Sequence, residues 1–137
     1  MRLDSRVYRY IEYELYHYEQ YKRDIKRERE RILEGSPPPP DGMPKGGKEG
    51  KPTEEKAVRL SSSASIAAME RVVEAVDMAL KRLTDRHRRL FELLYVSGRR
   101  DKYAVCNELY MSYATFKRNK WELIVAVGQE LGLVKVL

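Results

Sequence analysis

The chain has 137 residues, which is enough for about one ordinary domain with a single modest core. It contains no long apolar run and no apolar segment behind Met1 and Arg2, so we expect no membrane span, no secretory signal and an intracellular, soluble protein. One cysteine, Cys106, and two isolated histidines exclude an internal disulfide and a spaced metal cluster. The excess of 27 basic over 21 acidic residues, a net charge of +6, makes polyanions plausible partners without identifying one.

Residues 1–34 form the first segment, in which positions 3 to 34 lack glycine and proline. Apolar and aromatic side chains recur there at helical spacing, at Val7, Ile11, Leu15, Tyr18, Tyr21, Ile25 and Ile32. Acidic and basic residues fill the remaining positions and nearly cancel, as on a solvated helix face. We expect one long amphipathic helix that serves oligomerisation, with its many tyrosines in core or interface contacts.

Residues 35–56 hold all six prolines and five of the eight glycines, which predicts a flexible linker. Within it, Gly42, Gly47 and Lys48 match part of a phosphate-binding loop. Glu49 replaces the hydroxyl that such a loop needs for magnesium, and no strand precedes it. We therefore expect no nucleotide and no other cofactor.

Residues 57–83 return to helical periodicity and predict a second long helix. Its apolar seam consists of Ile66, Met69, Val73, Val76, Leu80 and Leu83. The seam is too short for a free-standing coiled coil, so the simplest partner is the helix at 3–34. That partner could come from the same chain, as a hairpin, or from a second copy in a homodimer.

Residues 84–137 predict three shorter helices and complete an all-α fold. Thr84 or Asp85 is a candidate N-cap for the first helix, which ends at Gly98. Asp101 and Ser112 can cap the next two, and Gly132 stops the last. The last helix turns Phe116, Leu123, Ile124, Val127 and Leu131 inward, whereas Trp121 and Val125 form a second apolar stripe expected on its outer side.

Two short helices joined by a tight turn, the second basic at its beginning, are typical of a helix-turn-helix that inserts its second helix into the DNA major groove. No acidic residue lies between Glu108 and Glu122. With Phe116 inward, the opposite face predicts DNA base readout by Tyr113, Ala114, Lys117, Arg118 and Trp121. Phosphate contacts are predicted for Arg99, Arg100, Lys102, Ser112, Thr115 and Lys120, the last by extending its side chain from the inward edge of the helix.

The order of these segments resembles the RinA/ArpU family of phage-encoded transcriptional regulators. The resemblance covers nearly the whole chain, through YIEYELYHYEQYKRDIKRERERIL (10–33), DGMPKGGKEGKPTEEKAVRL (41–60), MERVVEAVDMALKRL (69–83) and LYMSYATFKRNKWELIVAVGQELGL (109–133). It implies two long amphipathic helices and a C-terminal helix-turn-helix domain similar to region four of sigma factors. It also implies an activator of phage or prophage late genes in the cytoplasm of a bacterial host, associated with double-stranded DNA.

Two other functions remain open from the sequence. A small terminase subunit also joins a DNA-binding helical domain to an oligomerising one, but it would form a ring rather than a dimer. A helical protein-interaction module would not touch DNA at all. No paired carboxylates, nucleophile with a base, or metal set stands out, so an enzyme with a small-molecule substrate is not expected. Host RNA polymerase is a candidate further partner of a regulator.

Overall fold

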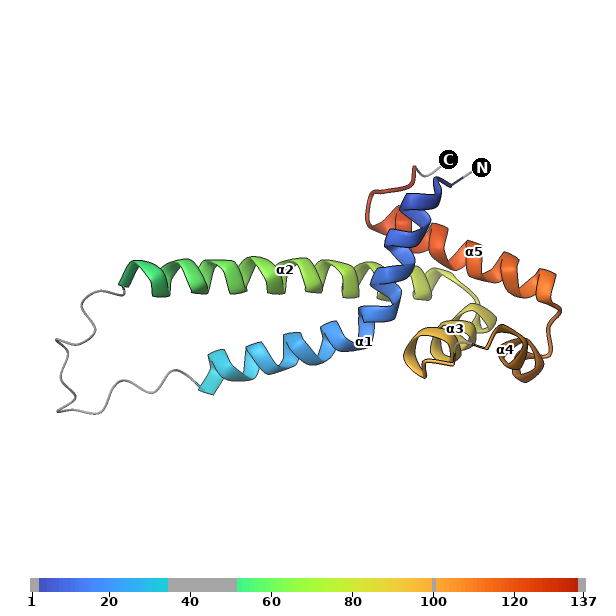
Figure 1. Cartoon of the computed structure of the whole chain (residues 1–137), viewed down its shortest axis with the longest axis horizontal. Coiled ribbons are helices and arrows are strands. Elements are labelled where there is room, and N and C mark those ends of the chain that lie inside the picture. Colours follow the sequence, from blue (N-terminus) through green and yellow to red (C-terminus); the bar gives the residue numbers. More distant parts are fainter. Residues whose placement is uncertain (1–2, 35–51, 100, 136–137) are drawn as a thin grey trace.

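The structure is a computed structural model that describes residues 3–34, 52–99 and 101–135, with the backbone alone for 34 and for 52–63. Its elements are α1 (Ser5–Glu34), α2 (Pro52–Arg82), α3 (Asp85–Phe91), the π-helical segment η2 (Glu92–Val96), α4 (Lys102–Leu109) and α5 (Tyr113–Glu130) (Figure 1). The described residues include no strand, so the predicted all-α class is confirmed for them. No helix in these ranges is long and apolar enough to cross a membrane.

Helices α1 and α2 pair within the chain and project from the rest of the molecule as a hairpin (Figure 1). The Tyr18 hydroxyl donates to Asp77 Oδ1 at 2.5 Å, and Arg29 pairs with Glu70 at 2.6 Å. Helix α2 begins at Pro52, five residues before the predicted start at 57, which shortens the predicted linker of 35–56. Proline suits the first turn of a helix, because an N–H there would have no partner within the helix.

The core lies where the first half of α1 and the last half of α2 meet the C-terminal helices. Figure 1 shows α1 bending about its middle, so that its N-terminal half lies against α5 and its C-terminal half runs beside α2. Ile11 and Leu15 of α1 are fully buried there, together with Val76 of α2 and Leu123 and Ile124 of α5. Full burial of such a side chain contributes roughly 1.5–3 kcal/mol, so this contact contributes substantially to the stability of the fold.

The helix boundaries predicted from local signals are largely confirmed. Thr84 is the N-cap of α3, Asp101 Oδ1 accepts from the amides of Tyr103 and Ala104, and Ser112 Oγ accepts from Thr115 N. Gly98 and Gly132 follow the helix ends with φ of 73° and 77°, a left-handed conformation that glycine adopts without strain. Cys106 is a buried core residue.

Candidate nucleic-acid interface

Helices α4 and α5 are joined by a turn of three residues, Tyr110 to Ser112. Tyr110 takes a left-handed conformation with φ of 54°. Its backbone N–H donates to the carbonyl oxygens of Asn107 and Cys106, in the last turn of α4. Leu109 before the turn and Phe116 after it are buried in the common core. The Asn119 amide, also buried, points back to Met111 Sδ at 3.9 Å. Both sides of the turn are therefore anchored, and the direction of α5 relative to α4 is fixed.

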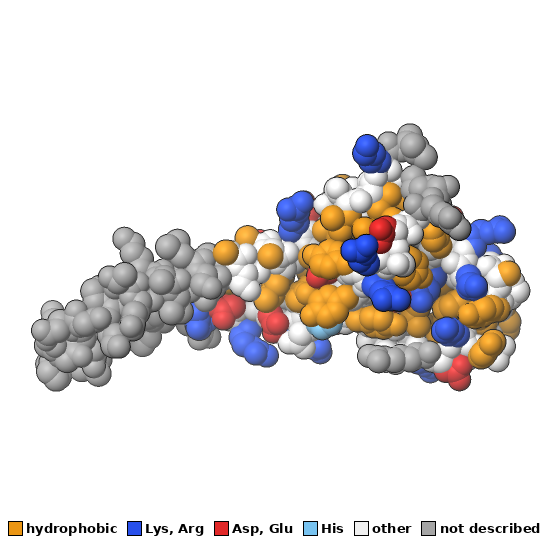
Figure 2. All heavy atoms as spheres, turned by 45° about the horizontal axis from the view of Figure 1, so that its top comes forward, with side chains coloured by type: hydrophobic (Ala, Val, Ile, Leu, Met, Phe, Trp, Pro, Cys, Tyr) orange, Lys and Arg blue, Asp and Glu red, His pale blue; other side chains and the backbone are white. Residues whose placement is uncertain are grey.

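The outer face of α5 carries exposed positive charge directly after its N-cap. Ala114, Lys117 and Arg118 are all exposed, and neither cation forms an ion pair with any described residue. Lys117 Nζ lies 5.5 Å from the centre of the Tyr113 ring, which in turn stacks on Tyr103 at 5.6 Å. Figure 2 shows several Lys and Arg side chains and little acidic surface at the end of the molecule that α4 and α5 form. Four of the five residues predicted for base readout, Tyr113, Ala114, Lys117 and Arg118, thus lie together.

The nearest acid on this helix faces elsewhere. Glu122, one turn after Arg118, directs a carboxylate oxygen to His87 Nε2 at 3.8 Å. His87 is buried, and its Nδ1 lies 2.7 Å from the Thr84 hydroxyl, in the cap of α3. Glu122 therefore lies beside α3 and does not neutralise the charges of Lys117 and Arg118.

Lys120 does not fit its predicted role as a phosphate contact. Its ammonium lies 2.8 Å from Glu12 Oε2, which also accepts from the Tyr95 hydroxyl at 2.8 Å. Burial lowers the pKa of Lys120, but the hydrogen bond and the negative charge of Glu12 outweigh that effect, so its pKa is raised overall. The charge of Lys120 is thus used inside the protein, to hold α5 against α1.

The second apolar stripe of α5 is also placed differently from the prediction. Val125 is buried and Trp121 is partly buried against the core, so neither forms an outer partner surface. The reason is that α1, α2, α3 and α4 all contact α5, so most of the helix beyond its first turns is covered. Trp121 is therefore less accessible than the other four residues predicted for base readout, and its role there stays a prediction.

The residues predicted to contact phosphate differ in how accessible their polar groups are. Lys102 is exposed at the start of α4, whereas the Arg99 guanidinium is paired with Glu108, and Arg100 lies outside the described residues. Ser112 and Thr115 bond each other in the cap of α5, at 3.0 Å between their hydroxyl oxygens. Among the members of this group that the structure describes, Lys102 is the one cation without an ion pair to a described residue.

Two exposed tyrosines beside this face were missed by the sequence reasoning. Tyr103 on the first turn of α4 is 67% exposed, and Tyr110 in the turn is 92% exposed. An aromatic residue in the turn between two capped helices is a signal that would have singled out Tyr110. Phenol hydroxyls are common phosphate and sugar contacts in DNA complexes, so both extend the face chemically.

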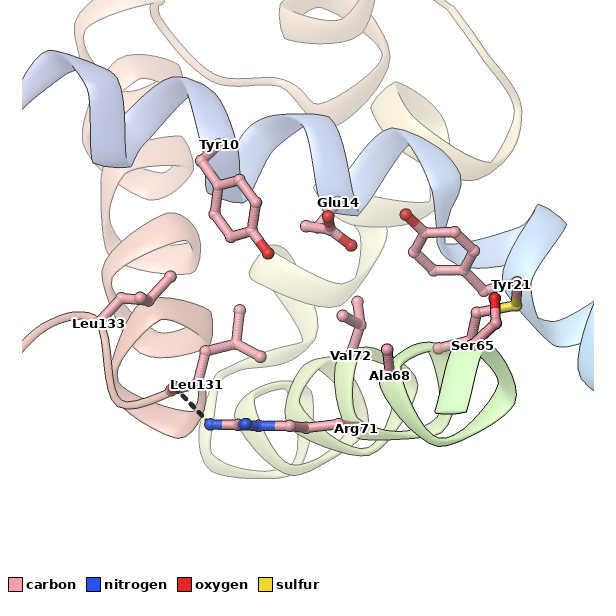
Figure 3. A pocket seen from close by; sticks show the side chains of 10 residues that line it. Tyr10, Glu14, Tyr21, Ser65, Ala68, Arg71, Val72, Leu131 and Leu133 are labelled. Carbon is pink, nitrogen blue, oxygen red and sulfur yellow. Dashed lines mark hydrogen bonds between the residues drawn. The ribbon is translucent and has the colours of Figure 1, made fainter. Parts of the chain in front are cut away.

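A cavity of about 450 Å³ lies away from this face, between α1, α2 and the segment after α5 (Figure 3). Glu14 is buried at its edge, and the hydroxyls of Tyr10 and Tyr21 point toward its carboxylate. Burial and the charge of Glu14 raise the pKa of both phenols, which keeps them protonated as donors. The two neutral phenols therefore face the buried carboxylate from the same helix, which is a structural arrangement within α1.

No group of three His, Cys, Asp or Glu side chains in the described ranges is placed to hold a metal ion. Comparison with protein-family models, with curated proteins and with solved structures finds no match.

Proposed function

We propose that this protein binds double-stranded DNA sequence-specifically and that α5 is its recognition helix. One observation carries the proposal: on the first two turns of this capped helix, Lys117 and Arg118 are exposed and form no ion pair with described residues, while its remaining length is held in the core. A helix that is anchored behind and cationic in front can enter the major groove with its N-terminal turns.

The residue types on this face suit direct readout of base edges. Arg118 carries a planar fork of donors that can bond O6 and N7 of a guanine together. Lys117 can reach a base or a phosphate, and Ala114 is small enough to allow the helix to approach closely. A surface helix whose charges served solubility alone would have no need for this combination at its N-terminal end.

Phosphate contacts would surround this centre. Lys102 supplies charge from α4, and Tyr103 and Tyr110 supply hydroxyls from α4 and the turn. The amides of Tyr113 and Ala114 lie in the first turn of α5, where helix geometry leaves N–H groups without a partner inside the helix. Such contacts position a protein on the duplex without reading its sequence.

The biological role that we propose is regulation of transcription, as an activator of phage or prophage late genes. The support is the resemblance of segment order and of the recognition-helix sequence to phage late-gene regulators, together with the exposed cationic face of α5. Host RNA polymerase would then be a second partner, because an activator acts on the polymerase at its promoter.

The test is a DNA titration on a duplex selected from a random library by the wild-type protein, with a scrambled duplex beside it. Arg118→Ala is expected to weaken binding to the selected site by roughly 1–3 kcal/mol and to weaken binding to the scrambled duplex much less. Arg27→Ala is the matched control, since Arg27 is exposed on the projecting part of α1. If the library yields no preferred sequence, or if both variants bind like the wild type, the proposal is wrong.

A further inference from the structure

The projecting hairpin has an open groove between α1 and α2 that no described segment fills. Its volume is about 630 Å³. Ile25 and Val73 lie at its apolar floor, and Leu33 and Met78 line it while 84% and 44% exposed. A groove lined by large, exposed apolar side chains on a projecting hairpin is a candidate surface for a partner.

The rims of this groove carry opposite charges. The rim on α1 contains Lys22, Lys26 and Arg29, and the rim on α2 contains Glu70, Glu74 and Asp77. Both rows step by four and three residues, so each row follows one face of its helix. Glu30 and Lys81 also line the groove, each with the charge opposite to that of its own row.

The rows are also in register with each other. The ion pair of Arg29 and Glu70 places these two residues at the same level of the hairpin. Helices α1 and α2 run antiparallel, so a position earlier in α1 lies level with a position later in α2. Lys26, three residues before Arg29, is therefore level with Glu74, four residues after Glu70. Lys26 and Glu74 form no ion pair with any described residue, so their charges are free for another molecule.

We propose that the groove is the interface with a second copy of this chain, packed groove to groove about a twofold axis parallel to the hairpin. This axis places α1 of one copy over α2 of the other and preserves the level of every residue. Lys26 of each copy then faces Glu74 of the other, and the exposed Leu33 and Met78 side chains of both copies are covered. A twofold axis running across the helices would instead place α1 over α1 and oppose like charges.

An interface of this kind is self-complementary, so two copies close on each other and no ring or filament grows. Both hairpins point the same way, and the two helical bodies lie at the same end. If α5 binds DNA as proposed above, the two copies of α5 are available to one duplex. The dimer itself does not rest on DNA binding, so its test is independent of that proposal.

The test uses charge reversal and light scattering on the full chain in the absence of DNA. The wild type is expected to be a dimer at about 100 μM. Lys26→Glu and Glu74→Lys, each alone, place two like-charge contacts in the dimer and are expected to weaken dimerisation at least about tenfold. Arg23→Glu, the same change of charge sign at an exposed position of α1 outside the groove, is expected to leave the dimer unchanged.

An equimolar mixture of the two reversed variants decides the geometry. In the mixed dimer, the carboxylate introduced at position 26 of one copy meets the ammonium introduced at position 74 of the other. The second contact keeps the wild-type Lys26 and Glu74 pair, so the mixture should dimerise like the wild type. Damage to the fold of one chain would not be repaired by mixing. A monomeric wild type, dimers that persist in both single variants, or a mixture that stays monomeric would each overturn the proposal.

Discussion

Replacement of Lys120 by methionine tests how α5 is held in place. Methionine keeps an apolar stem of similar length and removes the ammonium that lies 2.8 Å from Glu12 Oε2. Glu12 then keeps only the hydrogen bond from the Tyr95 hydroxyl. The negative charge of Glu12 would be left partly desolvated between α1 and α5, which is the physical cause of the expected loss.

The magnitude follows from the exposure of the pair. Breaking a fully buried ion pair costs about 3–5 kcal/mol, whereas an exposed pair contributes about 0–1 kcal/mol. The side chains of Lys120 and Glu12 are 18% and 20% exposed, between these limits. We expect Lys120→Met to lower the free energy of unfolding by about 1–3 kcal/mol, which corresponds to a fall in Tm of roughly 4–12 °C for a chain of this size.

The assay is chemical unfolding of the wild type, Lys120→Met, Glu12→Gln and the double variant. A double-mutant cycle isolates the coupling between the two side chains, which we expect to be at least about 0.5 kcal/mol. Because the pKa of Lys120 is raised in the folded state, its contribution is present at neutral pH and is lost as the pH rises through that raised pKa. Coupling should therefore disappear in strongly alkaline buffer.

The same variant separates structural from DNA-contacting charge. Lys120→Met should leave the salt dependence of DNA binding unchanged, whereas loss of a phosphate contact lowers the slope by about one. The reasoning is refuted if Lys120→Met unfolds like the wild type and also lowers the salt slope, because the ammonium would then face DNA rather than Glu12.

Three further changes test the packing around α5. Leu15→Ala empties a fully buried position and should cost about 2–5 kcal/mol in unfolding free energy, while Leu33→Ala on the exposed part of the same helix should cost far less in the monomer. Gly128→Ala places a methyl group 2.7 Å from Ile11 Cδ1 and from Val134 Cγ2. The crowding costs more than the better helix propensity of alanine contributes, so thermal unfolding should show a net loss of stability of about 0–2 kcal/mol. A clear increase in stability would mean that α1 packs less closely on α5. Tyr110→Gly relieves the left-handed backbone of an exposed residue and should raise stability by about 1 kcal/mol; a fall would show that the phenol makes a stabilising contact.

The local features of this fold follow from the sequence to a large extent. The caps Asp101 and Ser112 and the glycines at 98 and 132 act through residues only a few positions away, so the helix boundaries could be predicted without the fold. The inward position of Phe116 follows equally from helical periodicity. Helix α2 begins earlier than predicted, because its N-terminal proline was assigned to the linker.

The contacts between distant segments could not be predicted in the same way. Glu12 and Lys120 are separated by 108 positions, and nothing in the sequence near Lys120 shows that an acid on α1 reaches it. The burial of Val125 likewise depends on how many helices surround α5, which periodicity along one helix does not reveal. The exposure of Lys117 and Arg118 could therefore be predicted from the sequence, whereas the partly buried position of Lys120 could not.

Site-specific photocrosslinking from position 114 tests the central claim most directly. A photoreactive amino acid replaces Ala114, at the centre of the proposed recognition face, and the same amino acid replaces Arg27 on the hairpin as the control. Each protein is irradiated with the selected duplex, and the crosslinked nucleotide is identified. The account predicts a crosslink from position 114 to a base within the selected sequence and none from position 27. A crosslink from position 27 with none from position 114, under conditions in which the duplex is bound, would contradict it.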